Sequence, residues 1–243
     1  IQKILEHSDG MMVARGDLGV EVPLESVPII QKNLIRAARD NGKFVITATQ
    51  MLMSMVTNPR PTRGEASDVA NAILDGTDAV MLSAESANGE YPIEACAMLG
   101  KIAAATEPYM INSVDKTTVS IHGTASISMA VGRAAAWLAA DVNAAAIVAY
   151  TQSGFTATAV AQFRPSSPIL ALTPSETTCR QLSLCWGTTA VKIESAGDTD
   201  EIFAQARELV CKYNFAKKGD LIVLTAGVAM QAGSTNLVRV LTV

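Results

Sequence analysis

The chain has 243 residues, of which 49% are hydrophobic and 17% are charged, so it can bury one large core or two ordinary ones. Its formal net charge of -4 argues against a surface that attracts nucleic acid, so no nucleic-acid partner is expected. No apolar run approaches the roughly 18 residues that a membrane-spanning helix needs, so no membrane partner is expected either.

Short apolar runs alternate with longer helical patterns in the first half of the chain, which is typical of parallel βα units. The chain opens at Ile1, with neither an initiator Met nor a signal-like segment, and this start indicates a fragment or a processed chain. A strand is predicted over residues 10–14. A helix is predicted over residues 24–40, where apolar residues recur at helical spacing and Asn41-Gly42 closes the helix.

The second unit begins with a predicted strand over residues 44–49. Two prolines in the segment 58–61 impose an extended loop. Thr62 and Glu65 then have the spacing of a capping box before a predicted helix over residues 66–74.

The third unit has a predicted strand over residues 78–82 and a helix over residues 92–106 with proline at its first turn. Three βα units cannot close a barrel and leave a bare strand edge on each side. An independently stable fold is therefore not expected of this half.

A polar stretch without periodicity, residues 111–123, is the predicted domain boundary. Beyond it a helix over residues 126–140 leads into an apolar strand over residues 144–150. The last segment, residues 237–243, follows a loop too short for a crossover helix, so we expect it to pair antiparallel with the preceding strand. Further strands, with helices between them, are expected at residues 169–172, 190–193 and 221–224.

The four cysteines form no CxxC pair and no zinc-ligand spacing with the two histidines, His7 and His122. Buried, reduced thiols in a cytoplasmic protein are the expected state. The cysteines are Cys96, Cys179, Cys185 and Cys211.

Polar residues follow all three strands of the first half, where functional groups of parallel α/β structures gather. Asp17 ends the first strand, flanked by Gly16 and Gly19. A carboxylate there suits a divalent cation, and the glycines let backbone N–H groups approach an anion. From spacing alone, an ordinary turn aspartate between glycines is the favoured interpretation.

The second and third strands end in hydroxyl and carboxylate side chains. Thr49 ends the second strand, where its hydroxyl could bond a substrate carboxylate or position a proton donor, although threonine is common in strands. Ser83 and Glu85 end the third strand and carry little weight singly. Three polar strand ends in three successive units favour a shared site.

Several segments resemble pyruvate kinases. Residues 12–21, Met-Val-Ala-Arg-Gly-Asp-Leu-Gly-Val-Glu, resemble the family segment that contains a magnesium-binding aspartate. Further motifs, in the family's order and spacing, are residues 47–52, 59–63, 68–71, 75–78, 81–86 and 89–92. The resemblance implies an α/β chain in two domains. Residues 1–112 would be the last three βα units of a TIM (β/α)8 barrel, and residues 118–243 a three-layer α/β/α allosteric domain with a mixed sheet.

The resemblance implies a phosphotransferase of glycolysis that moves the phosphoryl group of phosphoenolpyruvate to ADP, giving pyruvate and ATP. Mg²⁺ (or Mn²⁺) and K⁺ are the implied cofactors. The implied metal ligand is Asp17, and the implied substrate-binding residues are Gly16, Asp17 and Thr49. Thr49, Arg15 and Ser83 form the implied catalytic set.

The resemblance also implies a homotetramer for the full-length enzyme, with Arg63 and Asp68 at a subunit interface. An exposed pair on a helix surface is the simpler interpretation of these two residues. The family's catalytic lysine and second metal-binding glutamate would lie just before Ile1, so the chain alone is expected to be inactive.

The chain departs from the family pattern at a few positions. Ala84 stands where a glycine is usual, and Met53 replaces a common glutamate. Asn88 stands where many members have lysine, which weakens any charge contact to a nucleotide there.

A second candidate site opens the helix after the strand at residues 144–150, where hydroxyls, a glycine and free N–H groups form an anion cradle. Simple N-capping by Ser153 or Thr151 explains the same residues equally well. The resemblance implies that Thr151, Ser153, Gly154 and Thr156 bind the phosphate of an allosteric phosphometabolite. The facing loop, residues 227–236, contains no Lys, Arg or Trp, the residues that bisphosphate-activated family members usually use there for the second phosphate. The resemblance therefore implies a monophosphate effector rather than a bisphosphate.

Two other interpretations remain open. Residues 118–243 could be a non-catalytic module that binds a phosphometabolite and is the only stable unit. A barrel lyase with metal-bound enolate chemistry ranks last, because such an enzyme is not expected to carry the segment 59–63 or the second domain.

Overall fold

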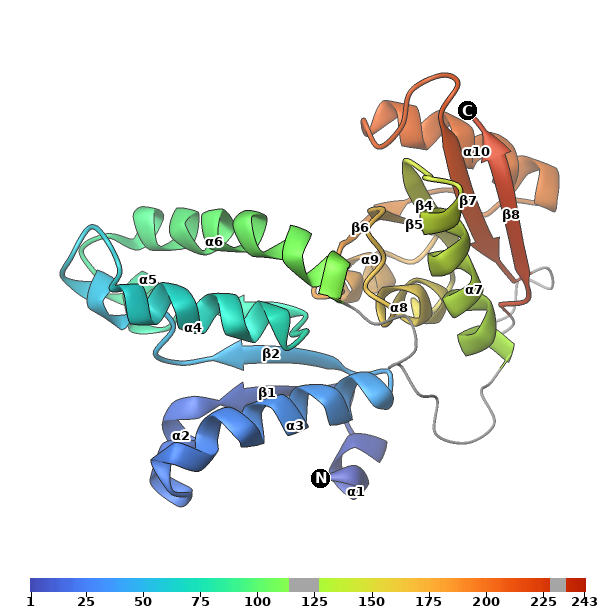
Figure 1. The fold of residues 1–243 in the computed structure, drawn as a ribbon. Helices are drawn as coiled ribbons and strands as arrows, with labels where there is room; N and C mark the ends of the chain where they lie inside the picture. The colour runs from blue at the N-terminus through green and yellow to red at the C-terminus, as the bar shows by residue number, and fades with distance from the viewer. Residues whose placement is uncertain (114–126, 228–234) are drawn as a thin grey trace. The chain divides into compact units, whose positions relative to one another are not determined.

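The computed structural model describes residues 1–113, 127–227 and 235–243. It divides into two compact units, Ile1–Thr118 and Val119–Val243 (Figure 1). Most of the predicted domain boundary, residues 114–123, lies outside the described residues, and His122 lies there too.

The first unit contains a three-stranded parallel sheet in the order β1-β2-β3. The strands are β1 (Gly10–Ala14), β2 (Phe44–Ala48) and β3 (Ala79–Met81). The helices are α1 (Gln2–Glu6), α2 (Arg15–Glu21), η1 (Leu24–Ser26), α3 (Val27–Asp40), η2 (Met53–Val56), α4 (Arg63–Leu74), α5 (Ala84–Ala87) and α6 (Pro92–Ser113). The predicted order of βα units is confirmed, and the described residues form no closed barrel.

Helix α3 packs on β1 and β2 through one apolar face. Its residues Ile35 and Ala38 are fully buried with Val13 of β1 and Val45 of β2, as helical spacing of small and aliphatic residues requires. The helix ends at Asp40, followed by Gly42 with φ 68°, so the predicted closure is confirmed.

The capping box at the start of α4 is confirmed. The Thr62 side chain accepts from the Glu65 N–H at 3.2 Å, and the Glu65 carboxylate accepts from the Thr62 N–H at 2.8 Å. Glu65 also accepts from the Ser54 N–H at 2.7 Å. Burial raises the pKa of Glu65, but the hydrogen bonds from Ser54 and Thr62 outweigh it, so the pKa lies below its usual value.

The first strand has its predicted bounds, and the second ends one residue early. Strand β1 covers residues 10–14, but Asp17 does not end it as predicted, because α2 starts at Arg15 and Asp17 lies in its first turn. The glycines of this segment oppose a helix locally, and contacts from other parts of the chain override that preference. Strand β2 stops at Ala48 because Thr49 turns into the left-handed region, with φ 68°.

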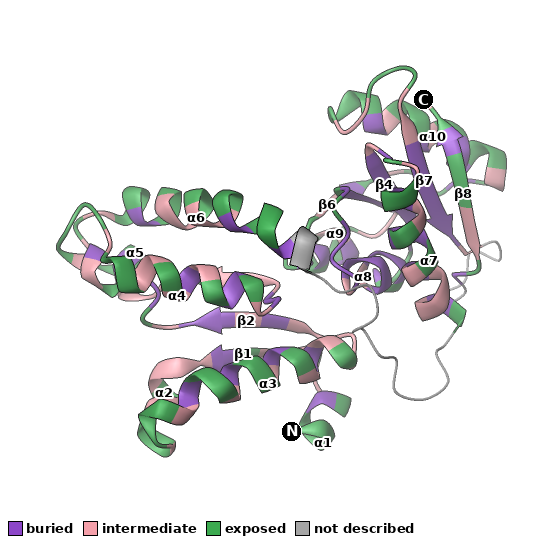
Figure 2. Cartoon of the chain, viewed as in Figure 1, coloured by how far each residue is buried: buried purple, intermediate pink, exposed green. Residues whose placement is uncertain are grey.

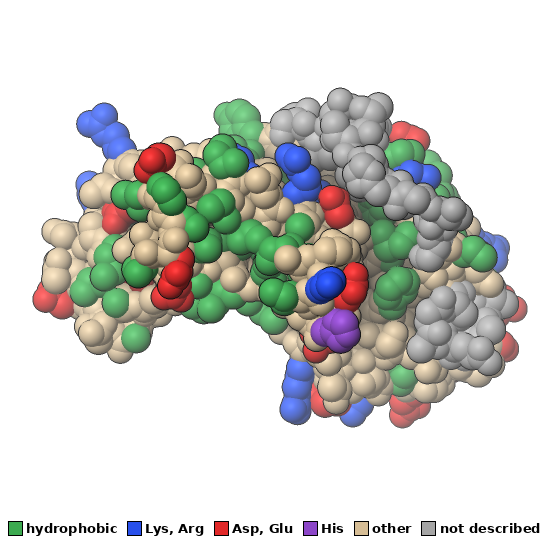
Figure 3. Space-filling view, turned by 90° about the horizontal axis from the view of Figure 1, so that it is seen from below, with side chains coloured by type: hydrophobic (Ala, Val, Ile, Leu, Met, Phe, Trp, Pro, Cys, Tyr) green, Lys and Arg blue, Asp and Glu red, His purple; other side chains and the backbone are tan. Residues whose placement is uncertain are grey.

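Apolar side chains are exposed on the helices of the first unit, and Figure 3 shows hydrophobic side chains gathered between charged ones on one of its faces. Examples are Ile4, Val20, Leu24 and Ile29, on α1, α2, η1 and α3. Strands β1 and β3 are each paired on one side only within the described part of the chain. Incomplete coverage of this kind agrees with three βα units that do not close.

The second unit contains a five-stranded sheet in the order β6-β5-β4-β7-β8. Its strands are β4 (Ala146–Tyr150), β5 (Ile169–Thr173), β6 (Thr188–Lys192), β7 (Leu221–Ala226) and β8 (Leu237–Thr242). Its helices are α7 (Ile127–Asp141), α8 (Phe155–Ala161), α9 (Glu176–Leu182) and α10 (Thr199–Lys212). All pairs are parallel except β7 with β8, so the predicted antiparallel last strand is confirmed.

Both faces of this mixed sheet are covered. Every residue of β4 is buried, and Figure 2 shows β4 and β7 in the colour of buried residues. Val148 packs with α10 through Ile202 and Phe203, whereas the alternate residues Ile147 and Ala149 are fully buried on the opposite side. Helices on both faces give the expected three-layer α/β/α architecture.

The four cysteines are free, but the prediction that all are buried was wrong. Cys185 is buried and Cys179 is intermediate, whereas Cys96 and Cys211 are exposed. Burial raises the pKa of the Cys179 thiol, and the nearby carboxylate of Glu176 raises it further. Among the described helices, none is both long and apolar enough to cross a membrane.

Candidate active site

The three strands of the first unit end at one edge of the sheet. Ala14 is level with Ala48, and Ala48 is level with Met81. Because the strands are parallel, the residues that follow them meet at this edge. The polar strand-end residues predicted from sequence therefore share one region, which we call the strand-end site: Arg15, Gly16, Asp17, Thr49 and Ser83.

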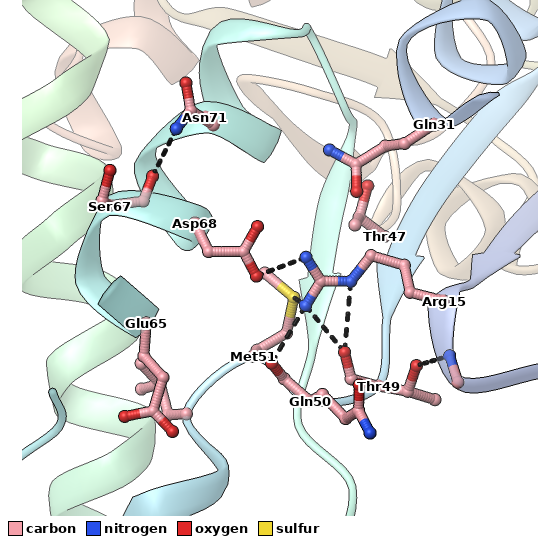
Figure 4. A network of polar contacts seen from close by, with 12 residues as sticks. Arg15, Gln31, Thr47, Thr49, Gln50, Met51, Glu65, Ser67, Asp68 and Asn71 are labelled. Carbon is pink, nitrogen blue, oxygen red and sulfur yellow. Dashed lines mark hydrogen bonds and ion pairs between the residues drawn. The ribbon is translucent and has the colours of Figure 1, made fainter. Parts of the chain in front are cut away.

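Thr49 and Gly16 join the first two βα units. The Gly16 N–H donates a hydrogen bond of 2.8 Å to Thr49 Oγ1, drawn as a dashed line in Figure 4. A Cβ at position 16 would lie 3.5 Å from the same hydroxyl oxygen, an ordinary van der Waals contact, so the contact does not require glycine at this position. The contact brings together two residues that the sequence separates by a whole helix.

Arg15 is directed toward the loop after β2 rather than toward open solvent (Figure 4). Its Nη2 donates to the Thr49 carbonyl at 2.8 Å and to the Gln50 carbonyl at 3.0 Å, and its Nε donates to the Thr49 carbonyl at 3.2 Å. Nη1 forms an ion pair with Asp68 of α4. The Arg15 side chain is only 9% exposed, so this guanidinium is a part of the packed structure.

Asp17 is exposed in the first turn of α2, next to the Gly16 N–H group. A carboxylate at a helix start is favourable in itself, because the helix N-terminus is partially positive. The described residues contain no cluster of three or more His, Cys, Asp or Glu that could hold a metal ion. Within them a cation at this edge would thus find fewer than three such side chains.

Glu85 proves to be a buried structural carboxylate. Its Oε1 accepts from the Leu52 N–H at 3.0 Å, and its Oε2 accepts from the Ser83 N–H at 2.8 Å. The residue is 0% exposed, so both oxygens are occupied away from solvent. Sequence reasoning noted Glu85 as a strand-end residue but gave it no role, because nothing local marks a carboxylate that bridges two loops.

The two residues predicted at a subunit interface lie on α4 and differ in surroundings. Asp68 is partly buried by its ion pair with Arg15, whereas Arg63 is exposed at the start of the helix. The simpler interpretation, an exposed pair on the helix surface, does not describe Asp68. An interface role for either residue stays a prediction.

The predicted phosphate loop of the second unit is tied internally. Thr151 Oγ1 accepts from the Gly154 N–H at 3.0 Å, and Gly154 is left-handed with φ 88°. The Thr156 hydroxyl is hydrogen-bonded to the Thr235 hydroxyl at 2.7 Å, and both residues are buried. Ser153 is exposed. Sequence reasoning missed Thr235 as a partner of Thr156, because 79 positions separate them.

Most of the loop that faces these residues in the prediction, residues 228–234, lies outside the described residues.

A parallel βα sheet with polar strand ends, followed by a mixed α/β/α sheet, defines a two-unit α/β protein. Residues 1–96 match the family described as "Pyruvate kinase, barrel domain", and residues 129–241 match "Pyruvate kinase, alpha/beta domain". The chain belongs to the pyruvate kinase family.

Curated relatives agree with the family match. The chain is 48% identical over 241 residues to a pyruvate kinase of Sporosarcina psychrophila, covering 99% of this chain and 41% of the relative. It is 47% identical over 243 residues to the pyruvate kinase of Clostridium acetobutylicum, covering 99% and 51%. With the pyruvate kinase of Geobacillus stearothermophilus it shares 49% identity over 241 residues, covering 99% and 41%. The chain thus spans about half or less of the length of these relatives.

Proposed function

We propose that this chain serves the pyruvate kinase reaction, in which the phosphoryl group of phosphoenolpyruvate passes to ADP and gives pyruvate and ATP. Membership of the family supports the reaction class. The observation that carries the proposal is the 2.8 Å hydrogen bond between the Gly16 N–H and Thr49 Oγ1. It supports a shared site, because it brings a hydroxyl and a backbone donor from different units together beside the exposed Asp17 carboxylate.

Substrate binding would use the groups that now bond each other. Thr49 Oγ1 accepts from the Gly16 N–H. A substrate carboxylate that took over this N–H as acceptor would leave the Thr49 hydroxyl free to donate to the same carboxylate. The N–H of Asp17 would add a further donor at the helix start. Backbone donors of this kind cost little reorganisation when the ligand binds, because the fold already orients them.

Proton delivery is the second role proposed for Thr49. Its hydroxyl would lie near the face on which the enolate carbon is protonated, with water as the proton source. The loop after β2 fixes the position of that hydroxyl, since Thr49 is held by its own carbonyl as well as by its side chain.

Asp17 is the residue proposed to hold Mg²⁺ or Mn²⁺. One exposed carboxylate fits this ion, because Mg²⁺ takes one or two protein carboxylates together with substrate oxygens and water. When bound, the ion offsets charge on the transferring phosphoryl group. A requirement for K⁺ is proposed from family membership alone.

Arg15 and Ser83 complete the proposed catalytic set, and both are proposed to act through the groups that they position. The Ser83 N–H is held by Glu85, and the Arg15 guanidinium is held by the loop after β2 and by Asp68. These contacts support a contribution through the geometry of the strand-end site.

Residues 118–243 are proposed to form the allosteric domain, and residues 1–112 to be part of the catalytic barrel. A phosphometabolite, with a monophosphate favoured, would bind at Thr151, Ser153, Gly154 and Thr156. Calorimetry with a sugar monophosphate and with a sugar bisphosphate tests this choice, and tighter binding of the bisphosphate contradicts it. A homotetramer with Arg63 and Asp68 at an interface, and a cytoplasmic location, are further proposals.

The reaction can be tested in a chimera in which residues 1–243 replace the matched segment of the Geobacillus stearothermophilus pyruvate kinase. We expect pyruvate formation from phosphoenolpyruvate and ADP. Asp17→Ala should lower kcat/KM by about 100- to 1,000-fold, because charge stabilisation is lost at the transferring group. Mn²⁺ affinity, followed by electron paramagnetic resonance, should fall by at least about tenfold.

Asp200→Ala is the matched control, because Asp200 is also an exposed aspartate in the first turn of a helix. It should leave both readouts unchanged. An active chimera that keeps its turnover and Mn²⁺ affinity after Asp17→Ala would overturn the proposed metal site. An inactive chimera whose second unit is stabilised by a sugar monophosphate would favour the non-catalytic binding module instead.

A further inference from the structure

The turn after β2 has an uncommon backbone. Thr49 and Gln50 are consecutive residues with positive φ, 68° and 54°, and neither is glycine. A side chain makes this left-handed conformation unfavourable, so it persists only where the surroundings hold it in place. The groups that hold this turn also fix the Thr49 hydroxyl, because Thr49 is the first of its two left-handed residues.

One side of the turn is held through its carbonyl groups. The Arg15 guanidinium donates to the carbonyl oxygens of Thr49 and Gln50 at 2.8 and 3.0 Å. The planar, multi-donor shape of a guanidinium allows one side chain to reach both oxygens while its other nitrogen pairs with Asp68. Figure 4 shows this arrangement, with Arg15 between Asp68 and the turn.

The other side of the turn is held through an amide group. Leu52, fully buried at the end of the turn, donates its N–H to Glu85 Oε1 at 3.0 Å. The second oxygen of Glu85 accepts from the Ser83 N–H after β3. The carboxylate of Glu85, which belongs to the third βα unit, therefore anchors the end of the turn that follows strand β2.

We propose that Arg15 and Glu85 are positioning residues that hold the turn 49–52 from its carbonyl side and its amide side, and so keep the Thr49 hydroxyl at the Gly16 N–H. The kinetic consequence of this inference rests on the proposed function, whereas the hydrogen bonds that hold the turn do not depend on it. Arg15 and Glu85 act through Thr49 and touch no reacting atom.

The kinetic test uses Arg15→Gln in the pyruvate kinase chimera. The variant should let the Thr49 hydroxyl move, and a displacement of about 1 Å should lower kcat by about 100-fold. KM for phosphoenolpyruvate should rise by only about threefold, because Thr49 is one of several proposed donors to the substrate carboxylate and the backbone donors remain. Arg36→Gln, an exposed arginine of the same unit, is the control and should leave kcat unchanged within about twofold.

The decisive measurement is a double-mutant cycle with Thr49→Val, which removes the hydroxyl and keeps the side-chain shape. If Arg15 acts through Thr49, then adding Arg15→Gln to Thr49→Val should lower kcat by no more than about twofold further. A full, multiplicative loss in the double variant would overturn the proposal for Arg15. The same cycle with Glu85→Gln decides the role of Glu85. Each oxygen of Glu85 accepts from one N–H group, whereas glutamine has one acceptor oxygen, so one of the two hydrogen bonds is lost.

Hydrogen exchange on the 243-residue chain gives a readout without turnover. Glu85→Gln should speed exchange at the Leu52 amide, and also at the Gly16 amide, by about tenfold, since loosening the turn frees Thr49 from Gly16. Glu65→Gln is the matched control, because Glu65 also accepts from backbone N–H groups but contacts Ser54 and Thr62 instead. Unchanged exchange at Gly16 in Glu85→Gln would overturn the coupling. If the unmodified chimera makes no pyruvate, the proposed function fails, and exchange at the Gly16 amide in Glu85→Gln and in Arg15→Gln still decides the positioning role of each residue.

Discussion

The strand-end site and the loop 151–156 both follow strands with parallel neighbours, yet they are held in different ways. In the first unit, charged side chains from other βα units hold the turn at Thr49 and Gln50. In the second unit, short hydroxyl groups and the left-handed Gly154 shape the loop. Backbone strain carried by residues with side chains needs distant support, whereas glycine adopts the same conformation at little cost.

Close backbone packing gives the largest stability effect that we predict for the second unit. Gly132 of α7 lies against α8 so closely that a Cβ would come within 2.8 Å of the Ala159 backbone. Gly132→Ala should therefore destabilise the second unit by about 2–3 kcal/mol, through overpacking. Urea unfolding of the chain measures the effect. Gly100→Ala is the control, since nothing lies within 4 Å of a Cβ there, and it should stabilise helix α6 by about 0.5–1 kcal/mol.

The charged support of the first unit predicts the next largest effect. Asp68→Asn leaves the largely buried Arg15 guanidinium without its ion-pair partner and should cost about 1–3 kcal/mol of stability. Glu176→Gln breaks an exposed pair with Arg180 in the second unit and should cost less than about 0.5 kcal/mol. Equal losses of unfolding free energy in urea would show that the ion pairs of the two units contribute equally to stability.

A smaller effect is expected at the glycine of the second loop. Gly154→Ala puts a side chain at φ 88° and should destabilise the second unit by about 1–2 kcal/mol. Gly187→Ala, at φ 60° with open space around it, separates the backbone cost from any packing cost. If Gly154→Ala cost much more than Gly187→Ala in thermal unfolding, the contacts with Leu182 and Thr178 would contribute, and the loop would depend on packing as well.

The smallest effect concerns pH. The pKa of Glu65 is lowered in the folded state, so the folded state binds fewer protons there than the unfolded state. Its contribution to stability is present above the unfolded pKa of about 4.3 and is lost as pH falls through the lower folded pKa. Urea unfolding at several acidic pH values should show a shallower loss of stability in Glu65→Gln than in the unmodified chain. An identical pH dependence would contradict the assignment.

Local patterns predicted much of the fold. The capping box of Thr62 and Glu65 was confirmed because both residues act on the first turn of their own helix. The antiparallel β8 was confirmed because loop length alone forbids a crossover. Boundaries were less accurate: α6 runs to Ser113 where residue 106 was the predicted end, and β6 spans Thr188–Lys192 instead of residues 190–193.

The strand-end site could be predicted in part. The sequence indicated that Asp17, Thr49 and Ser83 follow successive strands, and the parallel sheet brings those ends to one edge. It did not indicate α2, whose glycines disfavour a helix, or the turn at Thr49 and Gln50. Both depend on partners from other parts of the chain.

By itself the sequence determined the order of the βα units, the strand ends that carry polar groups and the resemblance to pyruvate kinases, because these depend on local periodicity and on motifs read in order. Only the tertiary structure decided that Arg15 and Glu85 support the loop after β2, that Asp68 neutralises Arg15, and that Thr235 pairs with Thr156. Burying a lone charge or an unpaired polar group costs free energy. The partners of such groups are therefore residues that lie close in the folded structure, even where they are far apart in the sequence.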